Sequence, residues 1–251
     1  MIHYVCVATD SKLYFAYLLM AIPELVILGM DQPWEGYITK FKLFSSYLDT
    51  IPNDDIVCFI DSWDVMPTKN IVHLEEQFIE FSNNNPNVKM VVGYDNKDYF
   101  PFHKQIKKIK NRGGNTKQER LNAGQFIGYV KNVKPIVQHI LNKNSNLSAE
   151  ENKKYSDSTE LTKYSTLFPE ELFSDNTNLF FKVVTTPLIQ VKIKETNYTY
   201  SFVHANGNGR LEDLIEKELN ITIGKNERVK IYFTHVNSLL KKIKYLIKKE
   251  T

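Results

Sequence analysis

Five apolar residues lead directly into two carboxylates in the segment Ile56-Val-Cys-Phe-Ile-Asp-Ser-Trp-Asp-Val65. The apolar run predicts a buried strand, and the polar residues after it predict a tight turn. An unpaired carboxylate beside a buried strand is costly, so Asp61 and Asp64 need a cation. Because a tight turn brings both carboxylates together, they suit a hard divalent metal, which can also neutralise a diphosphate. The alternative is a structural turn in which one aspartate caps the backbone.

Strand-like and helix-like patterns alternate on both sides of this segment. Such alternation predicts an α/β fold, in which ligands bind at the carboxyl ends of the strands, where Asp61 and Asp64 fall. The expected strands are 2–9, 24–29, 56–60, 88–94, 179–184 and 188–193. A further apolar segment covers 121–130, and the segment 202–210 is expected to end a short strand in a Gly-rich turn. The expected helices are 13–20, 38–48, 74–81, 133–141, 160–167 and 239–249, and the expected loops are 104–120 and 142–158.

Length and composition indicate one globular domain over residues 1–251. The chain is 42% hydrophobic, which is enough to build one substantial core. A net charge of +3 is too small for nucleic-acid binding over the whole surface, so any anionic ligand must bind locally. Two cysteines exclude a disulfide scaffold, and no apolar stretch has transmembrane length. Since no signal peptide precedes the first strand, we expect a cytoplasmic protein.

The C-terminal segment 239–249 is basic and amphipathic. It is interpreted as a terminal helix that packs its leucine and isoleucine stripe on the domain. The alternative is a helix that contacts a membrane surface or an acceptor.

Several short motifs spread along the chain resemble, in the same order, segments of the glycosyltransferase domain of the collagen lysyl hydroxylase family. That family has a run similar to Phe59-Ile-Asp-Ser-Trp-Asp-Val65. The other matching segments are Val7-Ala-Thr9, Trp34-Glu-Gly36, Lys40, Leu121-Asn-Ala-Gly-Gln-Phe-Ile-Gly-Tyr129, His204-Ala-Asn-Gly207 and Arg210. The resemblance covers most of the chain up to about Leu219. Several ordered matches are far more specific than any one of them.

The resemblance implies a glycosyltransferase-A fold, a Rossmann-like mixed sheet with flanking helices. It also implies a manganese ion and a UDP-sugar donor, with Asp61, Asp64 and His204 as metal ligands. Two carboxylates and an imidazole form a donor set that suits manganese. Taken alone, His204 would be an ordinary loop histidine, and His235 is left out because no Asn-Gly turn follows it.

The resemblance assigns roles to further residues around the donor. Trp63 is expected to stack on uracil, although a core-filling role is the alternative. Arg210 is expected to bridge the diphosphate, and Lys40 to act there as a point charge. The segment 122–124 passes close to the donor sugar or forms a left-handed turn. The expected donor site is Val7, Ala8, Thr9, Trp34, Lys40, Asp61, Ser62, Trp63, Asp64, Asn122, Gly124, His204, Asn206, Gly207 and Arg210.

The acceptor side departs from the family pattern. The family has an acidic run there, whereas this chain has Ser156-Asp-Ser-Thr-Glu-Leu161, in which only Asp157 and Glu160 are acidic. These two, with Arg210 and Asn122, are the expected catalytic residues. An inverting transfer needs a general base, so the thinned cluster favours a retaining one.

Within the family, glucose transfer from UDP-glucose to galactosylhydroxylysine is retaining, and galactose transfer from UDP-galactose to hydroxylysine is inverting. We therefore expect a glucosyltransferase acting on a collagen-like protein or glycopeptide. Galactosyl transfer is the alternative, as are a transferase for an unrelated glycan and an inactive sugar- or partner-binding domain. The Asn- and Lys-rich composition suggests a stand-alone form from a microbe or a large DNA virus, which would place the protein in the host cytoplasm.

Overall fold

The computed structural model describes residues 1–95, 121–185, 188, 190–193, 195, 197–206 and 209–250. Its main feature is a six-stranded sheet with strand order β2-β1-β3-β6-β5-β7. The β1 strand pairs in parallel with β2 and β3, whereas β6 runs antiparallel to both β3 and β5. The sheet is therefore mixed, as expected. The strand bounds are β1 Ile2–Val7, β2 Val26–Leu28, β3 Ile56–Ile60, β5 Met90–Tyr94, β6 Leu121–Tyr129 and β7 Leu172–Asp175.

A second, three-stranded sheet has the order β4-β9-β8, with β4 Val65–Pro67, β8 Phe181–Val183 and β9 Phe202–His204. The β3 strand passes into β4 through the turn that contains Asp61 and Asp64. Because β4 and β9 are antiparallel, Val65 lies opposite His204. This pairing brings the end of β9 to the turn after β3, although 140 residues separate His204 from Asp64.

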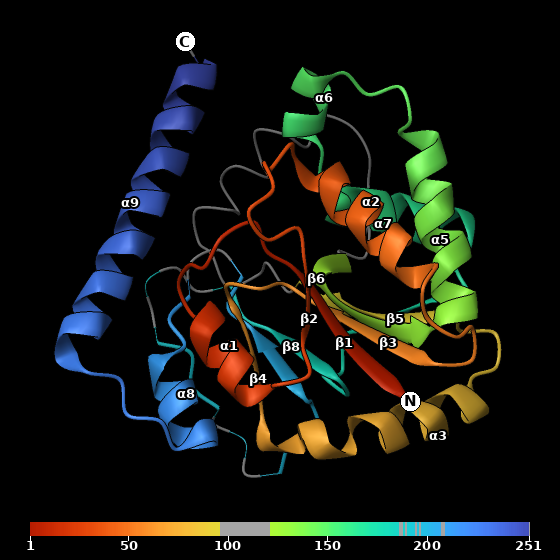
Figure 1. Ribbon diagram of the computed structural model, residues 1–251, viewed down its shortest axis with the longest axis horizontal. Helices are drawn as coiled ribbons and strands as arrows, with labels where there is room; N and C mark the ends of the chain where they lie inside the picture. The colour runs from red at the N-terminus through yellow and green to blue at the C-terminus, as the bar shows by residue number, and fades with distance from the viewer. Residues whose placement is uncertain are drawn as a thin grey trace.

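Helices cover both faces of the large sheet (Figure 1). Alternate residues of a strand point to opposite faces, so Cys58 and Ile60 join one core cluster while Val57 and Phe59 join the other. The first cluster includes residues of α1, α3 and α8, and the second includes residues of α2, α5 and α7. The helix bounds are α1 Phe15–Ala21, α2 Tyr37–Leu48, η1 Lys69–His73, α3 Leu74–Asn84, α5 Val130–Lys143, α6 Ala149–Lys154, α7 Asp157–Leu167, α8 Glu212–Leu219 and α9 Lys225–Glu250.

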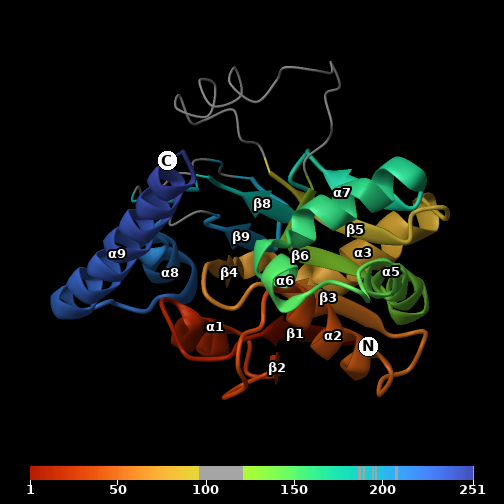
Figure 2. The ribbon, with the colours of Figure 1, turned by 90° about the horizontal axis from the view of Figure 1, so that it is seen from above.

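The last helix, α9, lies beside α1 and α8 at one edge of the molecule, as both views show (Figures 1 and 2). It begins well before the expected segment 239–249. None of the helices in the described ranges is both long enough and apolar enough to cross a membrane.

Most predicted elements are confirmed, and the strand at 56–60 agrees to the residue. Two predictions are wrong. The expected loop 142–158 contains α6, whose capping box of Ser148 and Glu151 stabilises a first turn that is otherwise polar. The expected strand 188–193 is reduced, in its described residues, to one bridge between Gln190 and Arg210. The expected loop 104–120 lies outside the described residues.

Candidate functional site

Three potential metal ligands meet where β3 ends. Asp61, Asp64 and His204 each offer one ligand atom, and these atoms lie within 4.8 Å of one another. The His204 Nε2 atom lies 3.2 Å from the Asp64 Oδ1 atom. The backbone holds the turn in place, because Asp61 N donates to Gly124 O at 2.7 Å and Ala205 N donates to Asp64 O at 2.8 Å. The three ligands expected from the sequence are thus brought together.

Asn122 determines which nitrogen of His204 faces this cluster. Its Oδ1 atom accepts a hydrogen bond from Gly124 N at 2.8 Å and lies 3.1 Å from His204 Nδ1. A backbone N–H can only donate, so this side-chain atom is the amide oxygen, and Nδ1 must carry the proton. In the neutral ring Nε2 then carries no proton, and it points at the two aspartates with its lone pair available for a metal.

Gly124 leaves the space that the cluster occupies. A Cβ atom at this position would lie 2.4 Å from His204 Cε1 and 2.6 Å from Asp61 Oδ2. The left-handed turn considered for 122–124 is wrong, because these residues belong to β6 and Gly124 has no positive φ. Glycine is required here because the Asp61 and His204 side chains occupy the space that a Cβ atom at position 124 would need.

Lys40 connects the cluster to the acceptor side. Its buried ammonium donates to Asp61 Oδ1 at 3.0 Å, to Ala123 O at 3.2 Å and to Asp157 Oδ2 at 2.5 Å. These bonds use the three N–H groups of the ammonium. Burial alone would lower the pKa of Lys40, but Asp157 and Asp61 outweigh it and raise the pKa above its ordinary value. Lys40 therefore stays charged and joins two carboxylates, and its role at the diphosphate stays a prediction.

The charges of the cluster favour a cation. Burial raises the pKa of Asp61, and the neighbouring charges of Lys40 and His204 offset this only in part. Burial would lower the pKa of His204, but Asp64 and Asp61 outweigh it and raise the pKa above its ordinary value. The raised pKa values mean that protons compete with a cation for these groups, so binding of a metal would displace protons. The cluster offers two carboxylate oxygens and the oriented Nε2 of His204, and Gly124 leaves space beside them because it has no Cβ atom. This donor set fits a divalent metal of the manganese type.

We expect the Asn122→Leu substitution to weaken Mn²⁺ binding about 10- to 100-fold, because His204 would lose the acceptor that sets its proton and orientation. Asn122→Asp is the matched control, since a carboxylate can accept the same two hydrogen bonds. Titration calorimetry with Mn²⁺ measures both variants. Equal affinity for Mn²⁺ in the leucine variant and the wild type would contradict this role of Asn122.

Asp157 and Glu160, the two acidic residues expected on the acceptor side, have different partners. Asp157 begins α7 and is bound to Lys40 beside the cluster, whereas Glu160 bonds to Asn144 and Lys163. The structure therefore brings Asp157, and not Glu160, to the cluster. Residues three positions apart lie close together on a helix, so the two side chains differ in their partners and not in the face they occupy: Lys40 of α2 binds Asp157, and Asn144 binds Glu160.

Two of the expected donor-binding residues, Ser62 and Trp63, lie in the turn between Asp61 and Asp64. Ser62 Oγ donates to Val7 O at 3.1 Å. Trp63 Nε1 donates to Asp10 O at 3.1 Å, and the Lys12 ammonium lies 4.8 Å from the Trp63 ring centroid. The ring is half-buried and not a fully buried core residue.

The remaining expected residues are placed as follows. Ala8 N donates to Leu28 O and Thr9 O accepts from Asp31 N. The exposed Trp34 packs edge-on against Tyr37, and Asn206 Nδ2 lies 3.3 Å from Asp95 Oδ2. Gly207 lies outside the described residues.

Arg210 lies in a buried network that the sequence patterns did not reveal. Its guanidinium donates to Glu212, which is fully buried, and Glu212 also accepts from Tyr14. His235, which the sequence reasoning set aside, lies against Tyr14 in the same network. No local motif marks Tyr14 or His235, because their partners lie about 200 residues away in the chain.

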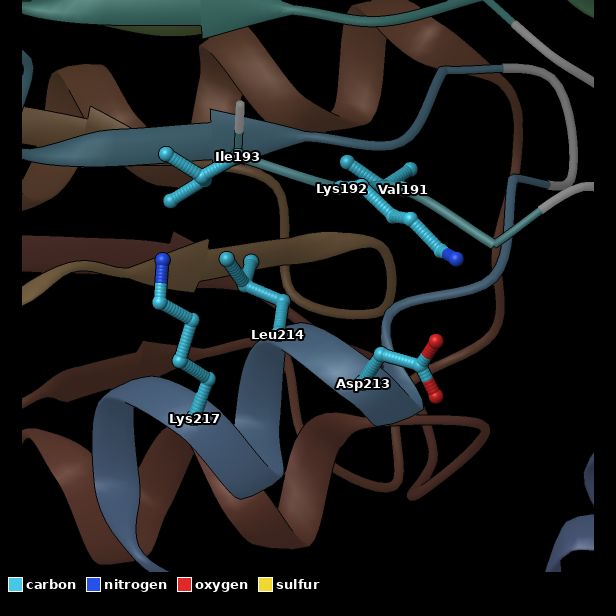
Figure 3. A pocket seen from close by; sticks show the side chains of 6 residues that line it. All are labelled: Val191, Lys192, Ile193, Asp213, Leu214 and Lys217. Carbon is cyan, nitrogen blue, oxygen red and sulfur yellow. The ribbon is translucent and has the colours of Figure 1, made fainter. Parts of the chain in front are cut away.

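A pocket of about 260 Å³ lies apart from the cluster, between the segment 191–193 and α8 (Figure 3). Its lining is formed by Val191, Lys192, Ile193, Asp213, Leu214 and Lys217. The ammonium groups of Lys192 and Lys217 point in different directions (Figure 3). None of the potential metal ligands lines this pocket, so it is not the candidate functional site.

Comparisons with known proteins concern the family and the fold of the chain. The family model described as PLOD GT domain matches residues 4–243. A glycosyltransferase involved in glycosylation of the major capsid of PBCV-1 is 13% identical over 88% of this chain and 99% of its own, with a TM-score of 0.54. The galactosyltransferase LgtC, solved with donor and acceptor sugar analogues, is 13% identical over 92% of this chain and 100% of its own, with a TM-score of 0.47. No curated protein sequence matches the chain.

Proposed function

Because the chain belongs to the PLOD GT domain family, and is thus a glycosyltransferase with the glycosyltransferase-A fold, we propose that it transfers a hexose from a UDP-sugar in a metal-dependent reaction. The observation that carries the proposal is the convergence of Asp61, Asp64 and His204 within 4.8 Å. Their positions match the motifs through which the sequence resembles the collagen lysyl hydroxylase glycosyltransferase domains. A domain that only bound a sugar would not need this cluster.

The residues of the chain have distinct tasks in this proposal. Asp61, Asp64 and His204 would hold Mn²⁺, which when bound supplies positive charge against the donor diphosphate. Asn122 orients the imidazole of His204, and Lys40 keeps the Asp61 carboxylate in place. Through these contacts the fold itself would fix the charges where negative charge develops on the departing UDP.

Transfer breaks the bond between the anomeric carbon and the β-phosphate oxygen and forms a bond from the same carbon to the acceptor oxygen. UDP leaves, and Arg210 stabilises its charge. Both oxygens of the Asp157 carboxylate already have partners, because Oδ2 is bound to the Lys40 ammonium at 2.5 Å and Oδ1 accepts from Ser158 N at 2.8 Å. The proton of the acceptor hydroxyl therefore passes to the departing phosphate. This favours retention over inversion, because inversion needs a separate general base.

Retention supports UDP-glucose as the donor and galactosylhydroxylysine of a collagen-like protein as the acceptor. Within the family that resembles this chain, this pair reacts with retention. The position of Glu160, away from the cluster, leaves Asp157 as the acidic side chain that faces the acceptor side. Galactosyl transfer to hydroxylysine would need a general base, and Asp157, the acidic residue of the segment 156–161 beside the cluster, is already bound to Lys40.

The test is an assay of UDP release in Mn²⁺ with two donors and three peptides of one collagen-like sequence. The peptides carry galactosylhydroxylysine, hydroxylysine or lysine, and the last is the matched control. We expect release from UDP-glucose to rise at least about 10-fold with the galactosylhydroxylysine peptide, because an oriented acceptor replaces slow hydrolysis. Nuclear magnetic resonance of the product then reports the configuration at the anomeric carbon.

Each other outcome changes a different part of the proposal. Stimulation by hydroxylysine with UDP-galactose would replace the donor and the acceptor. Turnover without any peptide effect would indicate an acceptor unrelated to collagen. Absence of both UDP binding and turnover with either donor would overturn the enzymatic proposal.

A further inference from the structure

Arg210 is held by a carboxylate that has no contact with solvent. Its Nε and Nη2 atoms donate to Glu212 Oε1 at 3.1 and 2.9 Å, and Glu212 is 0% exposed. A buried carboxylate is costly unless it is paired, so Glu212 holds the guanidinium firmly in one orientation. These two hydrogen bonds involve Nε and Nη2, which lie on one edge of the guanidinium. The N–H groups of Nη1 remain for another anion. The Arg210 side chain is 21% exposed, so the fold does not enclose it completely.

The second oxygen of Glu212 connects Arg210 to two other parts of the fold. Tyr14 Oη donates to Glu212 Oε2 at 2.9 Å and accepts from Leu211 N at 3.0 Å. The Tyr14 oxygen also lies 3.3 Å from Nε2 of His235, a buried residue of α9. The network therefore joins α1, α8 and α9 around one charged pair.

Helix α9 also contacts the arginine directly. The Tyr232 ring lies with its centroid 5.4 Å from the Arg210 guanidinium carbon, which is within the range of a cation–π contact. Ile231 is buried in the core, and Arg228 forms ion pairs with Asp213 and Glu216 of α8. The first part of α9 is thus docked on the body beside α8, as Figures 1 and 2 show.

This network is continuous with the metal cluster. Tyr14 N donates to Trp63 O at 3.3 Å, in the turn between Asp61 and Asp64. On the other side, Ala205 N donates to Asp64 O and Gly209 N donates to Ala205 O, which ties the backbone before Arg210 to the same turn. Movement of α9 against the body would therefore displace Arg210 relative to the cluster.

We propose that Glu212 and Tyr232 are positioning residues, and that α9 supports Arg210 for contact with the diphosphate of the donor. The inference rests on the proposed function, because a UDP-sugar is the ligand that brings a diphosphate to this place. Glu212 aims the guanidinium, and Tyr232 covers the face that solvent would otherwise reach. Helix α9 is then part of the donor site although it supplies none of the metal ligands.

Titration calorimetry with UDP and with inorganic pyrophosphate, both in Mn²⁺, tests the inference. We expect Tyr232→Leu to weaken the binding of both probes about 2- to 5-fold, the value of a partly exposed cation–π contact. Phe233→Leu is the matched control, because this neighbouring ring is 58% exposed. Glu212→Gln is expected to weaken binding about 10-fold or more, since the charge that fixes Arg210 is lost.

The melting temperatures separate positioning from a structural role. If Tyr232→Leu and Glu212→Gln lower the melting temperature but bind both probes like the wild type, the inference is overturned and the proposed function stands. If the variants lose pyrophosphate affinity while UDP does not bind even the wild type, the inference stands and the UDP-sugar proposal falls. If the wild type binds neither probe, both fall. Tyr232→Leu keeps the test valid should Glu212→Gln fail to fold.

Discussion

Replacement of Asp64 by asparagine will reduce Mn²⁺-dependent UDP release on the order of 100-fold or more, because a metal contributes several kcal/mol to the stabilisation of a leaving diphosphate. Asp64 is the better single site for this test than Asp61. The Asp61 carboxylate also binds the buried Lys40, so its loss would disturb the pair of Lys40 with Asp157 as well. Asp64 is 26% exposed, and its change should leave the fold intact.

Initial rates over a range of Mn²⁺ concentrations measure this effect, and titration calorimetry gives the metal affinity separately. Asp54→Asn is the matched control, because Asp54 is an exposed aspartate whose ion pair with Lys131 lies outside the cluster. We expect the control to keep the activity and the metal affinity of the wild type. Full metal-dependent activity in the Asp64→Asn variant, and in an Asp61→Ala, Asp64→Ala double variant, would refute the metal assignment.

A single methyl group at Gly124 is expected to abolish metal binding almost completely. The new Cβ would lie 2.4 Å from His204 Cε1 and 2.8 Å from His204 Nδ1, so the imidazole must move. The displaced ring would lose both its contact with Asn122 and its place beside Asp61. We expect Mn²⁺ affinity and activity to fall about 100-fold, and the free energy of unfolding to fall by about 1 to 3 kcal/mol through overpacking.

Gly224→Ala is the control for Gly124→Ala, because a Cβ at Gly224 would meet no atom within 4 Å. Its stability should stay within about 0.5 kcal/mol of the wild type. Urea unfolding and titration with Mn²⁺ measure the two consequences independently. A Gly124→Ala variant that unfolds at lower urea yet binds Mn²⁺ normally would show that the glycine serves packing alone.

Local patterns were sufficient for much of the architecture. The strand 56–60 is apolar at every position because helices cover both faces of the sheet, so its limits are visible in the sequence. The segment 142–158 was assigned to a loop because its composition is polar, and the short α6 depends on a cap more than on an apolar stripe. The β7 strand was missed because four residues carry too little periodicity.

Part of the candidate site could likewise be predicted from the sequence, and part of it depended on the fold. The sequence identified Asp61 and Asp64 as a pair of carboxylates at a strand end, and the ordered motifs added His204 and the glycosyltransferase family. The sequence left open whether Gly124 belongs to a left-handed turn or allows the backbone to pass close to a ligand, and it placed Lys40 at a phosphate. The tertiary structure excludes the left-handed turn, because Gly124 belongs to strand β6 and lies directly against His204 and Asp61.

The identity of the ligands could be read from short segments, since a strand, its turn and its carboxylates are consecutive residues. The side-chain contacts between those segments could not be predicted from the sequence, because they join residues that meet only after folding. Lys40 faces Asp157 across 117 positions, and Tyr14 meets Glu212 across 198. Such contacts follow from which helix covers which face of the sheet, and no local period encodes them. The fold therefore brings the predicted ligands together and links them to charged side chains of α2 and α7.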